Sequence, residues 1–270
     1  MKQLLCTLFF ILLFASCNNS QKRSSTTFAQ EEQVTDSFAL FTKNEEFPID
    51  SFTPGSPKLS VDLKMHYIVS TDKKRELAIN NAIVEHVFGY KNLEPQTAMD
   101  SFANYIKEEY MQLKDEYYNE KSINGGGEWF NYNYDIVSQI TNGRKNTINY
   151  SIHNISYTGG PHGSEYYTFL NFDSKSGKEI KLNDIFKENY YEALTDRLTV
   201  ALAKQKNAKS LEELQEMGYL ILNDMYPTDN FLLKTDSIIF HYNRYDIAPY
   251  ALGETTISFS YDELKDLLRK

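Results

Sequence analysis

The most regular pattern of apolar and polar positions in the chain begins at Lys58, in the stretch KLSVDLKMHYIV. Leu59, Val61, Leu63 and Met65 share one parity, and the serine, aspartate, lysine and histidine between them share the other. Side chains alternate between the two faces of a strand, so this pattern predicts a half-buried β-strand.

The next two stretches change to helical spacing, with apolar residues three or four positions apart. The first predicted helix is Thr71–Phe88, with Thr71 or Asp72 as its N-terminal cap and Gly89 at its end. The second is Thr97–Tyr118, which has one apolar face and one charged face. Two helices beside strands indicate an α+β arrangement rather than a helical bundle.

Runs of β-branched and aromatic residues return after the glycine-rich break NGGGEW and predict an antiparallel meander. The Asn-Gly pair in TNGRK is a strong hairpin signal between the first two strands. The apolar parity slips at Asn154, which predicts a bulge. The strands are expected at Trp129–Ile140, Asn146–Tyr157 and Glu165–Phe172.

The last part of the chain predicts a second group of helices and strands. We therefore expect an α+β fold made of two related halves, each an antiparallel sheet with helices, packed as one ectodomain. The halves are residues 58–124 and 125–270. The later elements are helices at Asn189–Lys206, Ser210–Asn223 and Asp262–Arg269, and strands at Phe231–Lys234, Asp236–Tyr242 and Thr255–Phe259.

The N-terminus, MKQLLCTLFFILLFASC, has the charge, apolar run and small residues of a secretory signal peptide. Ala15 and Ser16 before Cys17 resemble the lipobox of bacterial lipoproteins, although Phe14 departs from the usual Leu or Val. We expect residues 1–17 to be a lipoprotein signal peptide with Cys17 as the lipidated residue. The alternative is a soluble secreted protein cut nearby. The polar residues 18–57 are predicted to be a flexible tether and lead-in segment.

Composition limits the classes of protein and of partner that remain possible. The 270 residues are 41% hydrophobic and 14% aromatic, which is enough for a packed core, and the net charge is −9. No basic stripe appears, so nucleic acid is not an expected partner. An acidic surface favours a basic partner.

The familiar catalytic motifs are absent from the sequence. The sequence has no HExxH, no GxSxG and no phosphate-binding loop, and we expect no metal, no cofactor and no catalytic residue. Two alternatives stay open. His153, His162 and a carboxylate would form a site if the fold brings them together, and an envelope hydrolase would use a site near His162.

The stretch YTGGPHGSEYY lies between two predicted strands and is predicted to be a hairpin connection. Gly159, Gly160 and Gly163 permit positive φ, and Pro161 fixes its own φ. His162 is interpreted as a turn residue, yet binding residues concentrate on such loops. Gly159, Gly160 and His162 are therefore candidate binding residues.

A second candidate loop is YDIAPYALGE, in which Pro249 interrupts a strand and Gly253 permits a turn. Tyr245 and Tyr250 either pack over the core or remain exposed, and packing is the favoured interpretation. If exposed, both tyrosines join His162 as residues of the candidate binding loop.

Two motifs carry a resemblance to a known family. YTGGPHGSEYY resembles the Y-x-GG-x-H stretch of the extracellular domain family of the anti-sigma factor RsiV, and the segment from Ile238 to Leu268 resembles that family's closing pattern. Residues 58–118 resemble the domain that precedes it, which also occurs at the N-terminus of the deacetylase PdaC. In RsiV the domain binds lysozyme, and in PdaC the chemistry belongs to a separate domain. The resemblance thus implies binding rather than catalysis.

Together these patterns predict a lipid-anchored protein of the bacterial cell envelope, on the outer membrane and facing the periplasm. It would contact the membrane through its N-terminal lipid and act as a non-enzymatic binding module. The expected partner is a basic protein such as lysozyme, or peptidoglycan glycan. A purely structural lipoprotein is the remaining alternative.

Overall fold

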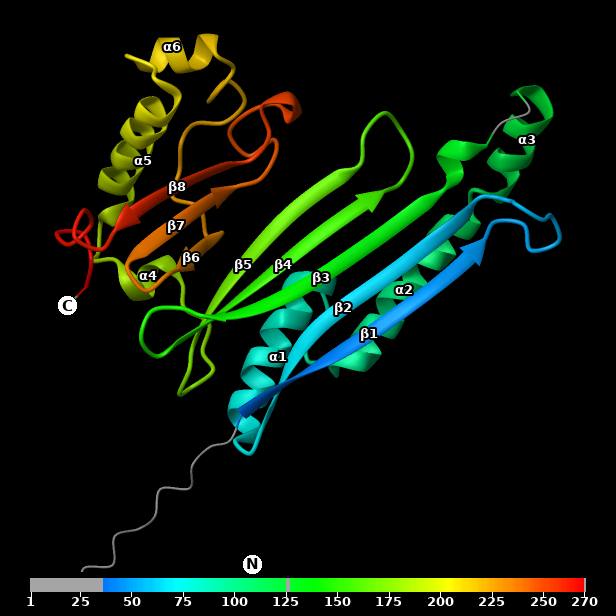
Figure 1. The fold of residues 1–270 in the computed structure, drawn as a ribbon, viewed down its shortest axis with the longest axis horizontal. Coiled ribbons are helices and arrows are strands. Elements are labelled where there is room, and N and C mark those ends of the chain that lie inside the picture. The colour runs from blue at the N-terminus through cyan, green and yellow to red at the C-terminus, as the bar shows by residue number, and fades with distance from the viewer. Residues whose placement is uncertain (1–35, 125–126, 270) are drawn as a thin grey trace, which may run out of the picture. The chain divides into compact units, whose positions relative to one another are not determined.

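A computed structural model gives the fold of residues 36–124 and 127–269 (Figure 1). It contains a five-stranded sheet in the order β1-β2-β3-β4-β5 and a three-stranded sheet in the order β6-β7-β8. Helices accompany both sheets, so the predicted α+β class is confirmed. The predicted signal peptide, Cys17 and the start of the predicted tether lie outside the described residues.

The elements follow one another in two groups. The first group is β1 (Asp36–Pro48), β2 (Lys58–Ser70), α1 (Lys73–Phe88), α2 (Pro95–Met111), α3 (Lys114–Asn124), β3 (Tyr132–Asn142), β4 (Thr147–Tyr157) and β5 (Ser164–Asp173). The second group is α4 (Leu182–Ile185), α5 (Tyr190–Lys206), α6 (Leu211–Glu216), β6 (Phe231–Leu233), β7 (Ser237–Tyr242) and β8 (Thr255–Ser260).

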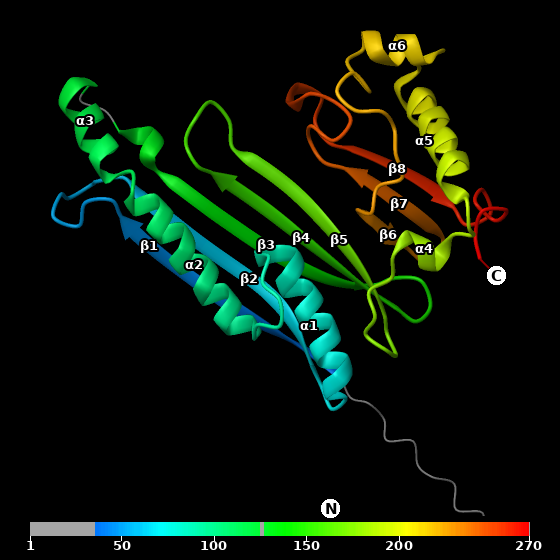
Figure 2. The same cartoon turned by 180° about the vertical axis from the view of Figure 1, so that it is seen from behind.

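The alternation in β2 decides which face of the first sheet is covered. Leu59, Val61, Leu63 and Met65 are fully buried, as predicted. Helices α1 and α2 lie against this face, in front of the sheet in Figure 2. They belong to the crossover that joins β2 to its parallel neighbour β3, while the other strand pairs are antiparallel. The opposite face of the sheet carries no helix in this group.

The predicted caps of the first helix are confirmed. The Asp72 carboxylate accepts hydrogen bonds from two backbone N–H groups of the first turn, and Gly89 ends the helix at φ 74°. The second predicted helix is instead divided into α2 and α3, with a break at Gln112 and Leu113.

Two expectations were wrong, one about a bulge in β4 and one about a helix at the C-terminus. β4 pairs without interruption with both neighbours through Asn154, so the predicted bulge is absent. The parity slips because Ile155 and Tyr157 lie on the face of β4 opposite Tyr150, where neither is fully buried, whereas Tyr150 packs in the helix-covered core. The predicted terminal helix is a series of turns, fixed where Leu264 is buried and Arg269 N–H donates to Ile185 C=O.

The predicted lead-in segment also needs correction, because part of it is a strand. Asp36–Pro48 forms β1, which pairs with β2 in an unbroken register from Asp36 opposite Ser70 to Pro48 opposite Lys58. Its apolar residues do not alternate strictly, so sequence periodicity alone did not reveal it. β1 is a strand because it pairs with β2 along its whole length.

The division of the chain also differs from the predicted halves. The predicted boundary at residues 124 and 125 falls inside the first sheet, since β2 precedes it and β3 follows it in direct pairing. The first hydrophobic core extends from Ile49 to Phe172, and the second from Leu182 to Leu264. The two cores therefore separate after β5, and the first sheet takes strands from both predicted halves.

Asparagine side chains connect the two sheets. Asn171 on β5 donates from Nδ2 to Phe231 C=O at 2.8 Å and accepts at Oδ1 from Leu233 N–H at 2.9 Å. Asn149 on β4 donates to Leu233 C=O at 3.0 Å. Both asparagines are 1% exposed. The Asn171 amide satisfies two backbone groups of β6 that would otherwise be buried without partners, while the Leu233 carbonyl also accepts from Arg144 N–H at 3.1 Å.

Asparagines from the second group also bond to the outer edge of β5. Asn243 accepts from Tyr167 N–H at 2.8 Å and donates to Tyr167 C=O at 3.0 Å. Asn230 accepts from Phe169 N–H and donates to the same Tyr167 carbonyl, both at 2.8 Å. A side-chain amide has the donor and acceptor of a peptide group, so these residues replace a neighbouring strand at this edge.

Candidate functional site

Two connections far apart in the sequence meet at one end of the molecule's sheets: the β4–β5 hairpin and the β7–β8 connection. The ring of His162 from the hairpin stacks on Tyr250 at a centroid distance of 4.8 Å and an interplanar angle of 17°. Tyr245 packs against the same tyrosine at 5.9 Å. Residues 161–166 together with Arg244, Tyr245 and Tyr250 line a hollow of about 210 Å³, called here the loop hollow.

Two of the three hairpin glycines have the positive φ that the sequence allowed for. Gly159 and Gly160 both have φ of 85°, and Tyr157 Oη donates to the Gly160 carbonyl at 2.9 Å. Gly163 has a different role from the one expected, because its φ is not positive. A Cβ at Gly163 would lie 2.9 Å from the Ser156 carbonyl oxygen, so glycine is needed there for space.

One side of the β7–β8 connection packs into the second core, and its other side is exposed. Ile247 and Ala248 are buried in the second core, and Leu220 N–H donates to the Ile247 carbonyl at 2.8 Å. Tyr245 N–H donates to Ala248 C=O at 3.0 Å, which closes a turn in which Tyr245 takes φ of 72°. Tyr245 is 53% exposed and Tyr250 is half-buried. The favoured packing interpretation therefore fits Tyr250 in part and does not fit Tyr245.

A network of charged side chains adjoins the aromatic rings of the loop hollow. Glu165 accepts from His153 Nε2 and from Arg244 Nη1, both at 2.9 Å. The Arg244 guanidinium also lies 4.8 Å from the centroid of the Tyr250 ring. The hydrogen bond from His153 and the charge of Arg244 hold the pKa of Glu165 below its ordinary value. Glu165 is thus a fixed anion that orients a histidine and an arginine.

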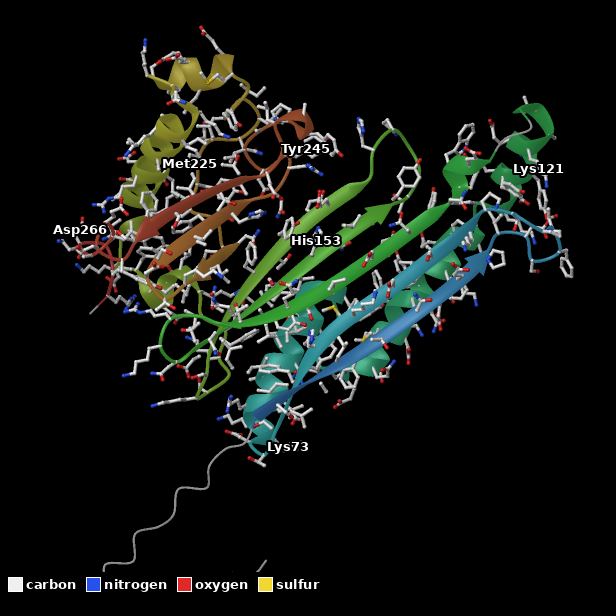
Figure 3. All side chains as sticks on the ribbon, in the orientation of Figure 1. Lys73, Lys121, His153, Met225, Tyr245 and Asp266 are labelled. Carbon is white, nitrogen blue, oxygen red and sulfur yellow. The ribbon has the colours of Figure 1, made fainter. Side chains whose placement is uncertain are left out.

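A second hollow lies on the helix-free face of the first sheet, where Figure 3 labels His153. His153 stacks on Tyr167 at 4.2 Å with an interplanar angle of only 5°, and Tyr167 is followed along the strand by Phe169. This sheet hollow has a volume of about 410 Å³ and is lined by Val137, Gln139, Ser151, Ile152, His153, Tyr167 and Phe169.

His241 fixes the wall of the sheet hollow from the side of β7. It is 4% exposed and packs edge-on against Tyr167 and Phe169, at 5.5 and 5.3 Å. Its Nε2 donates to Asn243 Oδ1 at 3.2 Å. Burial lowers the pKa of His241 from 6.5, against the opposing effect of Glu254.

This lowered pKa predicts a loss of stability in mild acid. Below about pH 6.5 the unfolded chain binds a proton at His241 that the folded chain does not, so the free energy of unfolding falls as the pH falls toward the folded pKa. We expect wild type to lose more stability between pH 7.5 and 5.5 than His241→Gln, measured by denaturant titration. Equal losses in the two proteins would contradict this assignment.

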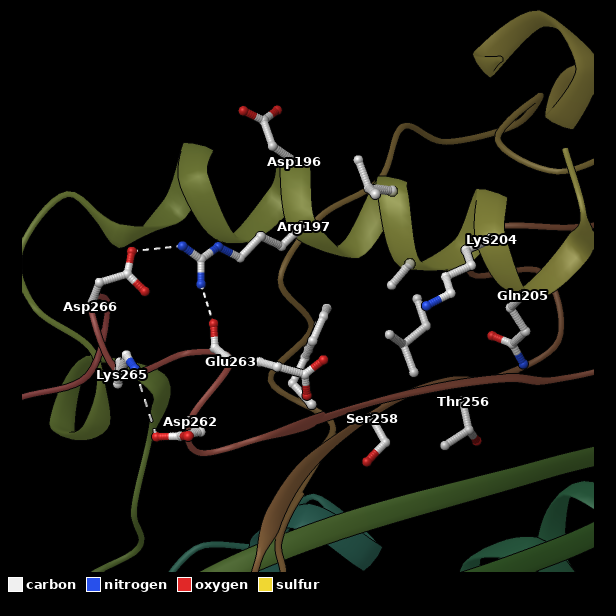
Figure 4. Close-up of a pocket in the computed structure, with 14 residues that line it drawn as sticks. Asp196, Arg197, Lys204, Gln205, Thr256, Ser258, Asp262, Glu263, Lys265 and Asp266 are labelled. Atoms are coloured by element: carbon white, nitrogen blue, oxygen red, sulfur yellow. Dashed lines mark hydrogen bonds and ion pairs between the residues drawn. The ribbon is translucent and has the colours of Figure 1, made fainter. Parts of the chain in front are cut away.

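A larger groove of about 950 Å³ lies between α5 and β8 (Figure 4). Some of its polar groups are paired with one another: Arg197 donates to Asp266 Oδ2 at 2.6 Å and to the Glu263 carbonyl, and Lys265 lies 3.9 Å from Asp262. Unlike the loop hollow, the groove has no aromatic pair stacked at its surface among the residues that line it.

The structure thus brings together His162, Tyr245 and Tyr250, which were proposed from two separate motifs. Gly159 and Gly160 shape the hairpin beside them. The set of His153, His162 and a carboxylate does not assemble, because His153 pairs with Glu165 while His162 stacks on Tyr250. Across the described residues, no group of three or more histidine, cysteine, aspartate or glutamate side chains has a metal-binding arrangement.

Sequence reasoning missed Glu165 and Arg244, and it considered His153 only in a set with His162. Two signals were available: Glu165 follows the GGPHG hairpin directly, and Arg244 precedes Tyr245. The hairpin register would also have placed His153 opposite Tyr167, two residues along the strand from Glu165.

The family described as "Protein of unknown function (DUF3298)" matches residues 183–262, which include Arg244, Tyr245 and Tyr250. The peptidoglycan-N-acetylmuramic acid deacetylase PdaC of Bacillus subtilis strain 168 is 28% identical over 142 residues. The predicted resemblance to PdaC is thereby confirmed. The match covers 52% of this chain and 29% of PdaC, so the chain spans less than a third of that relative.

Two solved structures have a similar fold. A DUF3298 family protein from Pseudomonas aeruginosa PAO1 is 15% identical with a TM-score of 0.57, covering 86% of this chain and 95% of that one, which supports the fold alone. A member of the same family from Bacteroides fragilis NCTC 9343 is 34% identical with a TM-score of 0.76, covering 87% of this chain and 94% of that one. The chain belongs to the DUF3298 family.

Proposed function

We propose that this protein is a non-enzymatic binding module of the bacterial cell envelope, which binds cell-wall glycan at the loop hollow. The observation that carries the proposal is the stacked pair of His162 and Tyr250, with Tyr245 and the Arg244–Glu165 ion pair beside it. Aromatic and charged groups from two connections converge on one small hollow.

The chemistry of the hollow suits a sugar ring. A pyranose has an apolar C–H face and a polar rim, and the tyrosine rings offer an apolar surface with a polar tip. Arg244 has more N–H donors than its single bond to Glu165 uses, and Glu165 has acceptor capacity. An acetamido group needs one donor and one acceptor, which these two residues supply. A few placed polar groups beside apolar surface are typical of small-ligand sites.

Peptidoglycan is the glycan that the comparisons favour. PdaC, which is similar over part of its length, is named as a deacetylase of N-acetylmuramic acid in peptidoglycan. We infer that the shared region contributes glycan binding rather than deacetylation. The resemblance of two sequence motifs to the RsiV family, whose domain binds lysozyme, also supports a location at the cell wall.

The proposal includes a lipid anchor at Cys17 and a position on the outer membrane, facing the periplasm. The signal-like residues before Cys17 and the small residues at positions 15 and 16 support it. None of the helices in the described ranges is long and apolar enough to cross a membrane. Cys17→Ser should move the protein from the membrane fraction to the soluble fraction; an unchanged distribution would contradict lipidation.

The test of glycan binding is co-sedimentation with purified, insoluble peptidoglycan. The full chain in mild detergent should sediment with the wall material, and soluble N-acetylglucosamine oligosaccharides should release it. Failure to sediment would refute the proposal, and release of soluble sugar during the incubation would favour the alternative of a hydrolase near His162.

A lysozyme-like basic protein is a second candidate partner, favoured by the net charge of −9. Attraction between an acidic and a basic protein is screened by salt. A titration with lysozyme should then show affinity that falls steeply between low and moderate salt. Absence of binding at both salt concentrations would remove this candidate and leave the glycan proposal unaffected.

A further inference from the structure

The loop hollow and the sheet hollow share a wall. Glu165 lines the loop hollow, His153 and Tyr167 line the sheet hollow, and His153 bonds to Glu165 while stacking on Tyr167. The path from one hollow to the other therefore passes along one strand, β5, and one bonded pair of side chains. The two hollows are neighbouring parts of one surface.

Their sizes differ in a way that bears on the ligand. Small-molecule sites commonly have volumes of about 300–1,000 Å³. The loop hollow, at about 210 Å³, lies below this range, whereas the sheet hollow, at about 410 Å³, lies within it. A ligand confined to the loop hollow would be small, and a longer ligand would have room to continue across the sheet.

The side chains of the sheet hollow are held in place before any ligand arrives. The Tyr167 backbone is bonded by Asn230 and Asn243, and its ring lies between His153 and the edge of His241. Rings held in this way lose little freedom when a ligand binds, which favours affinity. Gln139 is exposed at the rim and offers an amide donor and acceptor.

We propose that the loop hollow and the sheet hollow are successive subsites for a single extended glycan chain, so that the ligand is an oligosaccharide rather than one or two sugar units. This inference rests on the proposed glycan function and specifies its substrate class. A chain that occupies both subsites gains affinity because the second contact becomes intramolecular once the first has formed.

The test is a calorimetric titration of the full chain in detergent with N-acetylglucosamine oligosaccharides, from the disaccharide to the hexasaccharide. Affinity should rise about tenfold or more over this series. Gln139→Ala, which removes the amide donor and acceptor at the rim of the sheet hollow, should reduce the rise while leaving disaccharide affinity unchanged. Thr42→Ala is the matched control, because Thr42 is also an exposed strand residue and lies outside both hollows.

The outcomes distinguish the claim of a second subsite from the claim of glycan binding itself. Equal affinity for all lengths, lost in Tyr250→Ala, would overturn the second subsite and keep the loop hollow as the binding site. A length-dependent gain that is undiminished in Gln139→Ala would also overturn the second subsite at this position. No binding of any length would refute the glycan function itself. The length series in wild type is informative even if one variant fails to fold.

Discussion

Replacing Asn171 with leucine is expected to lower the free energy of unfolding by about 2–5 kcal/mol. The substitution leaves the Phe231 carbonyl and the Leu233 N–H buried without their partners. Each buried polar group that loses its hydrogen bond costs about 1–3 kcal/mol. Asparagine and leucine are similar in size, so the change is mainly the loss of the amide. Denaturant unfolding of the purified protein measures it.

Asn44→Leu is the matched control for this experiment. Asn44 is an exposed residue of β1, and its replacement should change stability by less than about 0.5 kcal/mol. If Asn171→Leu is as mild as this control, the amide bonds between the two sheets are not important for stability. Such a result would contradict the role given to the asparagines.

The second large effect concerns binding. Tyr250→Ala removes the ring that contacts His162, Tyr245 and the Arg244 guanidinium, and so removes the aromatic centre of the loop hollow. Central aromatic residues of binding sites often contribute about 2 kcal/mol or more, which corresponds to a weakening of roughly thirtyfold or more in Kd. Calorimetric titration with the disaccharide measures the change.

Tyr191→Ala provides the control for Tyr250→Ala. Tyr191 is 54% exposed on α5 and does not line the loop hollow. Its replacement should leave Kd unchanged. Equal affinities of wild type and Tyr250→Ala, with both proteins folded, would exclude the loop hollow as the glycan site.

The parts of the fold that sequence predicted are those set by local rules. The alternation of β2, the caps Asp72 and Gly89 and the Asn-Gly hairpin each depend on a few neighbouring residues, and all are found in the structure. β1 was missed because its order comes from pairing with β2 rather than from its own alternation. The division into two cores was misplaced because β3 joins a strand that precedes it by three helices.

The candidate site was predicted in parts and not as a whole. His162, Tyr245 and Tyr250 were chosen from two loops, but only the packing of the second group against β5 places those loops together. Glu165 and His153 read as polar strand residues, which are usually solvated. Their importance comes from a pairing with Arg244 that no local pattern contains.

The most direct test of the central claim is a crystal structure of the protein with the disaccharide of N-acetylglucosamine and N-acetylmuramic acid. The account predicts a sugar ring in the loop hollow, against Tyr250 and Tyr245 and bonded to Arg244 or Glu165. A sugar ordered only in the groove between α5 and β8, with the loop hollow empty, would contradict it.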